Sequence, residues 1–247
     1  IGIDHTTGLL RYWDLRFYKS KNFFRSIESS RYLPDFFGVN GPTSKNNLLK
    51  SGFPKTRVIE NDALRFNYLQ KYIDLSQKYI KFNNKILLIG DIDYYSTKKL
   101  LDDAQEISNF LDKKTKLIFR PHPGTKKINN LINSATKKNF SISELPLIEE
   151  ILKSDTIIVA GSSSVSVESY LLNKNVLVYL DRQKLNINPI NSVKSIKFTS
   201  NAKSLLQAIK NKSLAASTRK NNLFWLNSDL NKWRSIIESK LINDNSK

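Results

Sequence analysis

The sequence has no cysteine and no methionine among its 247 residues. Without cysteine there can be no disulfide, no thiolate metal ligand and no cysteine nucleophile, and this composition suits a reducing compartment. No apolar run approaches the length of a transmembrane helix. Because Met is absent and Ile1 opens what looks like a strand, we expect the sequence to be a fragment or a processed chain.

Acidic residues are also scarce, since 22 Asp and Glu stand against 40 Lys and Arg and give a net charge of +18. One interpretation is a compositional bias spread over solvated faces, and the other is attraction to nucleic acid, a membrane surface or a phosphorylated substrate. The lysines are scattered, and no RNP, zinc-finger or helix-turn-helix signature appears. We therefore expect no nucleic-acid partner. A hydrophobic fraction of 40% is enough for a packed core.

Short apolar runs after residue 84 indicate strands that are buried on both faces. These runs are 85–90, 116–120, 156–160 and 175–180. Helical patterns lie between them, at 97–111, 147–152 and 164–172. The alternation predicts βαβ units, and therefore an α/β domain with a Rossmann-like parallel sheet over residues 85–222.

The two ends of the chain differ from this middle part. Residues 1–84 are rich in aromatic residues and turns, which predicts the end of a preceding domain and a connector. Residues 223–247 carry Trp225 and Trp233 at helical spacings, which predicts a C-terminal closing helix. The two tryptophans are interpreted as core anchors, and the alternative is contact with a partner domain.

Three loops follow the predicted strands at the edge where open parallel sheets bind ligands. They are 90–93, which begins with Gly90 and Asp91, 120–124 and 161–164. We expect all three to face one crevice. In the third loop, Gly161 permits close backbone approach, and three serines offer hydroxyl and N–H groups to an anion at the start of a helix. The alternative is a serine that only caps the helix.

The second loop contains one of only two histidines, His5 and His122. His122 lies between two prolines, which hold the backbone extended. An imidazole fixed at a strand end can donate to a phosphate or protonate a leaving group. Arg120 adds a charge, although strand alternation leaves its direction open. The alternative is a turn histidine without a functional role.

The segment Arg120-Pro-His-Pro-Gly124 and the following serine cluster resemble the HP and SS motifs of bacterial CMP-sugar glycosyltransferases. These are the GT-B-fold sialyltransferases and the related Kdo transferases. The resemblance implies a donor half of a GT-B enzyme with part of the preceding domain. It also implies nucleotide contacts by the motif residues, which are His122, Pro123, Gly124, Ser162, Ser163 and Ser164, with Gly90 and Asp91 nearby.

A carboxylate that holds the ribose is expected between or just after these motifs in such enzymes. The candidates are Glu149 and Glu150, of which we prefer Glu150. Glu168, in the helix after the serines, is the second choice, either for ribose or for a structural role.

The first 18 residues resemble the block that ends the N-terminal, acceptor-side domain of bacterial surface-carbohydrate biosynthesis proteins. Sugar transfer needs a carboxylate, as base or as nucleophile. The resemblance to retaining β-Kdo transferases assigns this role to Asp14, with His5 and Asp4 as lesser candidates, although Gln is commoner at the position of Asp4. The alternative is an ion pair that fixes a loop, formed by Asp14 with Arg11 or Arg16.

Metal binding has little support, because no HExxH or EF-hand spacing occurs and GT-B enzymes generally work without a metal. We therefore predict a metal-independent glycosyltransferase without a cofactor. It would transfer an acidic sugar, Kdo or sialic-acid-like, from a CMP-sugar to a bacterial surface polysaccharide or lipopolysaccharide. The expected location is cytoplasmic, with peripheral contact to the anionic inner membrane. The alternatives are a GT-B enzyme that uses a UDP-linked or other nucleotide sugar, and a non-catalytic basic binding module.

Overall fold

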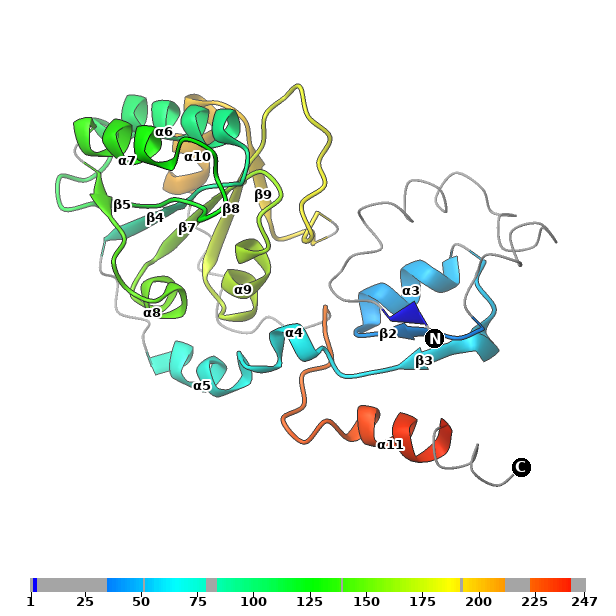
Figure 1. The fold of residues 1–247 in the computed structure, drawn as a ribbon. Helices are drawn as coiled ribbons and strands as arrows, with labels where there is room; N and C mark the ends of the chain where they lie inside the picture. The colour runs from blue at the N-terminus through cyan, green and yellow to red at the C-terminus, as the bar shows by residue number, and fades with distance from the viewer. Residues whose placement is uncertain are drawn as a thin grey trace. The chain divides into compact units, whose positions relative to one another are not determined.

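The computed structural model describes residues 2–3, 35–50, 52–78, 84–138, 140–191, 193–211 and 223–240. Two units divide the chain (Figure 1): Ile1–Lys71 with Lys220–Lys247, and Tyr72–Arg219. Within the described ranges, no helix is long and apolar enough to cross a membrane. The sequence pattern predicts a change of domain at residues 84–85, whereas the structure groups residues 72–84 with the second unit.

The second unit contains a six-stranded sheet in the order β6-β5-β4-β7-β8-β9, and each neighbouring pair is parallel. The strands are β4 (Lys85–Ile89), β5 (Lys116–Arg120), β6 (Ser141–Ile142), β7 (Thr156–Ala160), β8 (Asn175–Tyr179) and β9 (Lys197–Thr199). All four apolar runs of the sequence become strands. The predicted α/β class with a Rossmann-like parallel sheet is confirmed.

The strand order reverses once along the chain, between β4 and β7. From β4 the chain builds outward to β6, then returns to the other side of β4 and builds outward again to β9. Ile89 at the end of β4 pairs with Val159, next to the end of β7. In doubly wound sheets, ligands bind outside the carboxyl ends of the strands at such a switch point. The topology therefore marks the place to look for a site.

Helices cover both faces of this sheet. On one face lie α6 (Tyr94–Ser108), α7 (Ile128–Lys137) and α10 (Ala202–Lys210), and on the other lie α8 (Leu147–Leu152) and α9 (Val165–Leu171) (Figure 1). Side chains of alternate strand positions, such as Leu88 and Phe119, pack with α6 and α7 in a buried cluster. Because strand side chains alternate, the next positions, Ile89 and Arg120, point to the face of α8 and α9.

The first unit contains a three-stranded parallel sheet of β1 (Gly2–Ile3), β2 (Phe37–Val39) and β3 (Val58–Glu60). Its helices are α3 (Pro42–Lys50), the 3-10 turn η3 (Lys55–Arg57), α4 (Leu64–Asn67) and α11 (Asn231–Lys240), and α5 (Gln70–Lys78) leads into the second unit. A small core of Val39, Leu48 and Phe53 joins the sheet to α3.

The C-terminal segment belongs to the first unit and is helical only in part. Trp225 N donates to Asn40 O, and Trp225 O accepts from Ala63 N, both at 2.9 Å. Residues 223–230 form no helix and include a turn at 228–229, so helix in the predicted closing segment is limited to 231–240 within the described residues. The buried carboxylate of Asp62 accepts the Lys232 N–H at 3.0 Å, and Trp233 Nε1 donates to Asp62 O. Both predicted tryptophan anchors therefore hydrogen-bond within this unit.

Lys174 generates a testable dependence of stability on pH. It is 8% exposed, and its Nζ donates to Leu152 O at 2.6 Å, which ties the end of α8 to the turn before β8. Burial lowers the pKa of Lys174 to about 8, against an opposing effect of Asp155. The pKa of an exposed lysine is about 10.4, so between these values the unfolded chain binds more protons than the folded chain.

The free energy of unfolding should therefore rise between pH 8 and about 10.4, by at most about 3 kcal/mol from this one group. The measurement is urea unfolding followed by circular dichroism at several pH values, for the wild type and for Lys174→Met. The variant should lack this part of the rise, because it cannot titrate. Identical pH profiles of the two proteins would contradict the assignment.

Candidate functional site

A cavity of about 250 Å³ lies at the carboxyl edge of the second unit's sheet. Its lining comes from the ends of β4 and β5, the start of α8, and the segment between β7 and α9. Six of the residues predicted from the sequence line it, namely Gly90, His122, Pro123, Ser163, Ser164 and Glu168. Parts of all three predicted loops therefore meet at the switch point of the sheet.

The imidazole of His122 has a defined hydrogen-bonding role at this cavity. Gly124 N donates to His122 Nδ1 at 3.0 Å, so Nδ1 acts as an acceptor. In a neutral imidazole the proton is then on Nε2, which leaves an N–H donor. The loop that contains His122 is also tied to the loop after β4, because the buried Thr125 hydroxyl donates to Asp91 O at 2.9 Å.

Gly90 permits the loops after β4 and β5 to approach each other closely. A Cβ at this position would lie 3.1 Å from Thr97 Cγ2 and 3.2 Å from His122 N. The second distance involves backbone, which cannot move aside as easily as the end of a flexible side chain. Gly90 therefore helps to place His122 at the cavity by leaving out a side chain.

Asp91 and Ser162 fasten the serine loop and do not line the cavity. The Asp91 carboxylate is buried and accepts the Ser162 N–H at 2.6 Å through Oδ2. Gly161 has a φ of +59°, and a Cβ there would lie 2.1 Å from the same oxygen. Only a glycine combines this left-handed backbone with such close contact to the carboxylate.

The other two serines lie at the cavity, on the turn that opens α9. Ser164 makes no side-chain capping hydrogen bond to α9, whereas the Ser163 hydroxyl accepts from Val165 N, at the start of this helix, at 3.4 Å. The helix has only seven residues, and its dipole contributes correspondingly little. Any anion here would be held mainly by the hydroxyl and N–H groups of the loop.

The structure separates the three predicted carboxylates. Glu168 lines the cavity and is 9% exposed. Glu150, the preferred ribose ligand from the sequence, is buried outside the lining, and its Oε2 accepts from the Ser143 hydroxyl at 2.9 Å. Glu149 is exposed and lies 3.8 Å from Lys153 Nζ. Of these three, only Glu168 is placed to touch a ligand in the cavity.

Asp93, the second carboxylate of the Asp91-x-Asp93 pair, caps α6 through the Ser96 N–H at 2.8 Å. Burial alone would raise its pKa, but hydrogen bonds from Lys184 and Ser96 outweigh burial and hold the pKa at about 2. Lys184 Nζ lies 2.6 Å from the carboxylate. Within the described ranges, no group of three His, Asp or Glu side chains is arranged to hold a metal.

Sequence reasoning missed one residue that supports the serine loop, the fully buried Asn188. Its Nδ2 donates to Gly161 O at 2.8 Å, and its Oδ1 accepts from the Ser166 hydroxyl at 3.0 Å. An Asn-Pro pair in a polar stretch is a turn signal. That signal could have drawn attention to Asn188, but not to its partners, which are more than 20 residues away.

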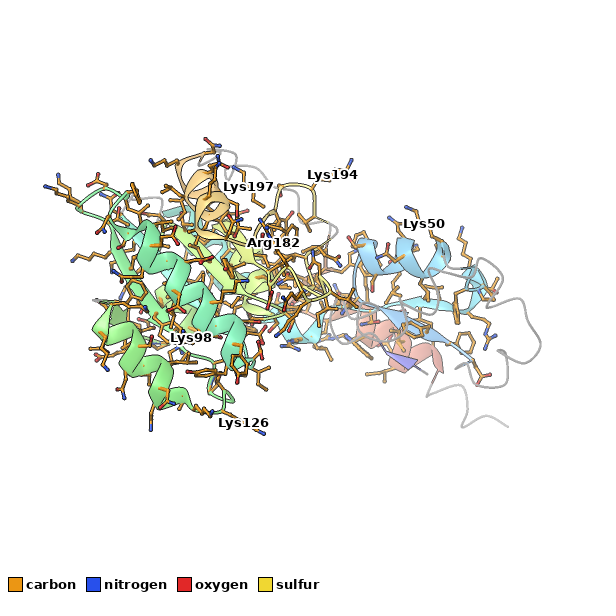
Figure 2. All side chains as sticks on the ribbon, turned by 90° about the horizontal axis from the view of Figure 1, so that it is seen from above. Lys50, Lys98, Lys126, Arg182, Lys194 and Lys197 are labelled. Atoms are coloured by element: carbon orange, nitrogen blue, oxygen red, sulfur yellow. The ribbon has the colours of Figure 1, made fainter. Side chains whose placement is uncertain are left out.

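Exposed and partly exposed cations are spread over several elements of the second unit (Figure 2). Lys98 lies on α6, Arg182 and Lys194 lie between β8 and β9, and Lys197 lies on β9. Some of the unit's lysines are paired, as Lys98 is with Asp102 at 2.7 Å. This distribution agrees with the interpretation of a basic composition spread over solvated faces.

Asp14, His5 and Asp4 lie outside the described residues. The structure therefore does not place the predicted carboxylate of the acceptor side. Their roles stay predictions.

Comparison with known proteins gave matches only among solved structures. No family model and no curated protein matches the chain. The UDP-GlcNAc 2-epimerase of Methanocaldococcus jannaschii, in complex with UDP-GlcNAc and UDP, has a TM-score of 0.61 at 16% identity, over 98% of this chain and 69% of that one. A putative UDP-N-acetylglucosamine 2-epimerase from Listeria monocytogenes has a TM-score of 0.61 at 15% identity. This match covers 96% of this chain and 67% of that one. MnaA of S. aureus, solved with UDP, has a TM-score of 0.58 at 15% identity. This match covers 88% of this chain and 62% of that one.

The fold is of the GT-B type. At these identities the likeness concerns the fold alone. It confirms the expected GT-B-like α/β architecture, and the chain spans about two thirds of the length of these structures. Which nucleotide or sugar a GT-B protein uses depends on its site, because one fold hosts many functions.

The bond between Asp91 and Ser162 can be tested by its effect on stability. Asp91→Ala should lower the free energy of unfolding by about 2–3 kcal/mol, because it removes a charge-assisted hydrogen bond and leaves the partly buried Ser162 N–H without this acceptor. The measurement is urea unfolding at neutral pH. Glu144→Ala, which removes an exposed carboxylate of the same unit, is the control and should change stability by less than about 0.5 kcal/mol. Equal effects of the two changes would show that the bond is unimportant.

Proposed function

We propose that this chain is the donor-binding part of a GT-B-type glycosyltransferase, and that its cavity holds a nucleotide sugar. The observation that carries the proposal is the convergence of His122, Ser163, Ser164 and Glu168 on one cavity at the switch point of a parallel sheet. Hydrogen-bond donors and a carboxylate in one small cavity suit a ligand that carries both a phosphate and a diol.

The phosphate contacts come from the loops after β5 and β7. His122 offers its Nε2–H, and Ser163 and Ser164 offer hydroxyls on a loop that Asp91 and Asn188 hold in place. When the sugar leaves, negative charge grows on the phosphate oxygen that was bonded to it. Donors already fixed around that oxygen stabilise the charge without having to reorganise.

The ribose contact belongs to Glu168. A carboxylate accepts hydrogen bonds from both hydroxyls of a ribose, because it offers two oxygens and no donor. Glu168 lies on the first turns of α9, one turn after Ser164, so it faces the same cavity as the serines. The role that the sequence assigned first to Glu150 passes to Glu168 in this proposal.

The donor in this proposal is a CMP-sugar with an acidic sugar, Kdo or sialic-acid-like, and the acceptor is a bacterial surface glycan or glycolipid. The resemblance of the HP and SS motifs supports this choice. Asp14 remains the proposed catalytic carboxylate, with His5 beside it in the sequence. The acceptor would lie at an anionic membrane, which the basic composition suits.

A second candidate is an enzyme that uses a UDP-linked sugar. It is favoured by the two similar structures that contain UDP or UDP-GlcNAc. The same phosphate and ribose contacts would serve either nucleotide, so only the base distinguishes the two candidates.

Removing the imidazole should weaken nucleotide binding. For His122→Ala we expect the Kd for the preferred nucleotide, CMP or UDP, to rise by about tenfold to a hundredfold, as is typical for loss of a hydrogen bond to a charged group. Isothermal titration calorimetry of both nucleotides measures it. Lys194→Ala, which removes an exposed charge away from the cavity lining, is the control and should leave the Kd unchanged. Unchanged affinity in His122→Ala would remove the histidine from the site.

The ribose assignment has its own test. Wild-type protein should bind a ribonucleotide more tightly than its 2′-deoxy counterpart by about fivefold to twentyfold, because Glu168 then loses one donor. In Glu168→Ala this ratio should fall to about one, whereas in Glu149→Ala it should stay as in the wild type. A ratio that survives in Glu168→Ala would place the ribose elsewhere.

A further inference from the structure

Arg120 is a cation of the cavity for which the proposed phosphate and ribose contacts give no role. It ends β5 and points to the face of α8 and α9, since its neighbour Phe119 packs on the opposite face. Arg120 is one of the residues that line the cavity, together with Leu147 at the start of α8. The direction that the sequence left open is therefore toward the face of α8 and α9, on which the cavity residue Leu147 also lies.

A chain of hydrogen bonds fixes the guanidinium. Arg120 Nη1 donates to the Ser143 hydroxyl at 3.0 Å and to Leu145 O at 2.6 Å. The Ser143 hydroxyl donates in turn to Glu150 Oε2 at 2.9 Å. Glu150 is 3% exposed, and the Ser143 hydroxyl links its carboxylate to Arg120. This arrangement gives the buried Glu150 a role as a positioning residue.

The anchored atom leaves the other edge of the guanidinium for a ligand. With Nη1 engaged, Nε and Nη2 present two parallel N–H donors, and neither has a hydrogen-bond acceptor in the part of the chain that the structure describes. A guanidinium offers donors only and cannot lose its proton in proteins. Its best partner is therefore a planar group with two adjacent acceptors.

The position of Arg120 along the cavity separates it from the serines of the proposed phosphate site, while His122, the third phosphate contact, follows Arg120 by two residues. β4 lies between β5 and β7 in the sheet, so the ends of the latter two strands are two strand spacings apart, or about 10 Å. Arg120 ends β5, and the serines follow β7. A nucleotide whose phosphate lies at the serines can therefore extend its base toward Arg120 and the apolar wall of Pro121 and Leu147.

We infer that Arg120, held by Ser143 and Glu150, reads the nucleobase of the ligand and selects cytosine. This inference rests on the proposed function. Cytosine places two acceptors, O2 and N3, side by side on one edge, whereas uracil has an N3–H donor between its two carbonyl groups.

Calorimetry with CMP, UMP and ribose 5-phosphate tests this reading. The wild type should bind CMP about tenfold or more tightly than UMP, as expected for one additional charge-assisted hydrogen bond. Arg120→Met should lose that preference and leave the Kd for ribose 5-phosphate, which has no base, within about twofold of wild type. Arg120→Lys keeps the charge but lacks the planar pair of donors, and it should also lose the preference.

Glu150→Gln should reduce the preference for CMP over UMP, because Arg120 is then less firmly held, while ribose 5-phosphate binding stays the same. A purely structural role would weaken all three ligands together. Arg182→Met removes an exposed arginine of the same unit and is the matched control for loss of charge. This variant should prefer CMP over UMP as strongly as the wild type does.

The possible failures of the two proposals can be told apart. If the wild type binds none of the three ligands, the proposed function is wrong. If the wild type binds nucleotides but Arg120→Met weakens ribose 5-phosphate as much as CMP, then Arg120 serves the phosphate and the base inference is overturned. A wild type that binds UMP as tightly as CMP overturns the inference as well.

Discussion

The geometry of the cavity depends on the buried carboxylate of Asp91. The carboxylate accepts the Ser162 N–H at 2.6 Å, and the backbone carbonyl of Asp91 accepts from the Thr125 hydroxyl at 2.9 Å. Asp91 thereby connects the loop after β7 with the loop after β5, which are not neighbours in the sequence. A carboxylate taken from water needs such partners, because an unpaired buried charge is costly. The residues that line the cavity are therefore held in place by one that does not line it.

Glycines make this connection geometrically possible. At Gly161 a side chain would collide with Asp91 Oδ2, and at Gly90 it would crowd His122 N. Both glycines lie at strand ends beside the switch point, where the three loops pack closely together. The absence of a side chain at these two positions thus allows the histidine and the serines to line the same cavity.

The parts of the fold that could be predicted are those fixed by local chemistry. Buried strands such as β4 and β7 are continuous apolar runs, and α8 follows its own periodicity. The helix predicted from residue 97 begins earlier, at Tyr94, because Asp93 caps it. β6 and β9 have only two and three residues, so they lack a pattern of their own and exist because a neighbouring strand offers hydrogen-bond partners.

The same distinction explains the outcome for the C-terminal segment. Leu223 and Phe224 are buried, and the periodicity of residues 223–241 is typical of a helix. The first part is nevertheless not helical, since Trp225 forms backbone hydrogen bonds with Asn40 and Ala63. These partners are far away in the sequence, and tertiary bonds of this kind override local propensity.

The choice between Glu150 and Glu168 shows most clearly what the sequence could not decide. Both are acidic residues in short helices that flank β7, and both are almost fully buried. Their difference comes from what surrounds each carboxylate. Glu150 meets the Ser143 hydroxyl, which also accepts from Arg120, whereas Glu168 faces the space beside the serines. A buried carboxylate next to a fixed arginine orients that arginine, and a carboxylate on the wall of a cavity can bind what enters it. The sequence supplies both residues, but only packing places Glu168 at the cavity and Glu150 outside its lining.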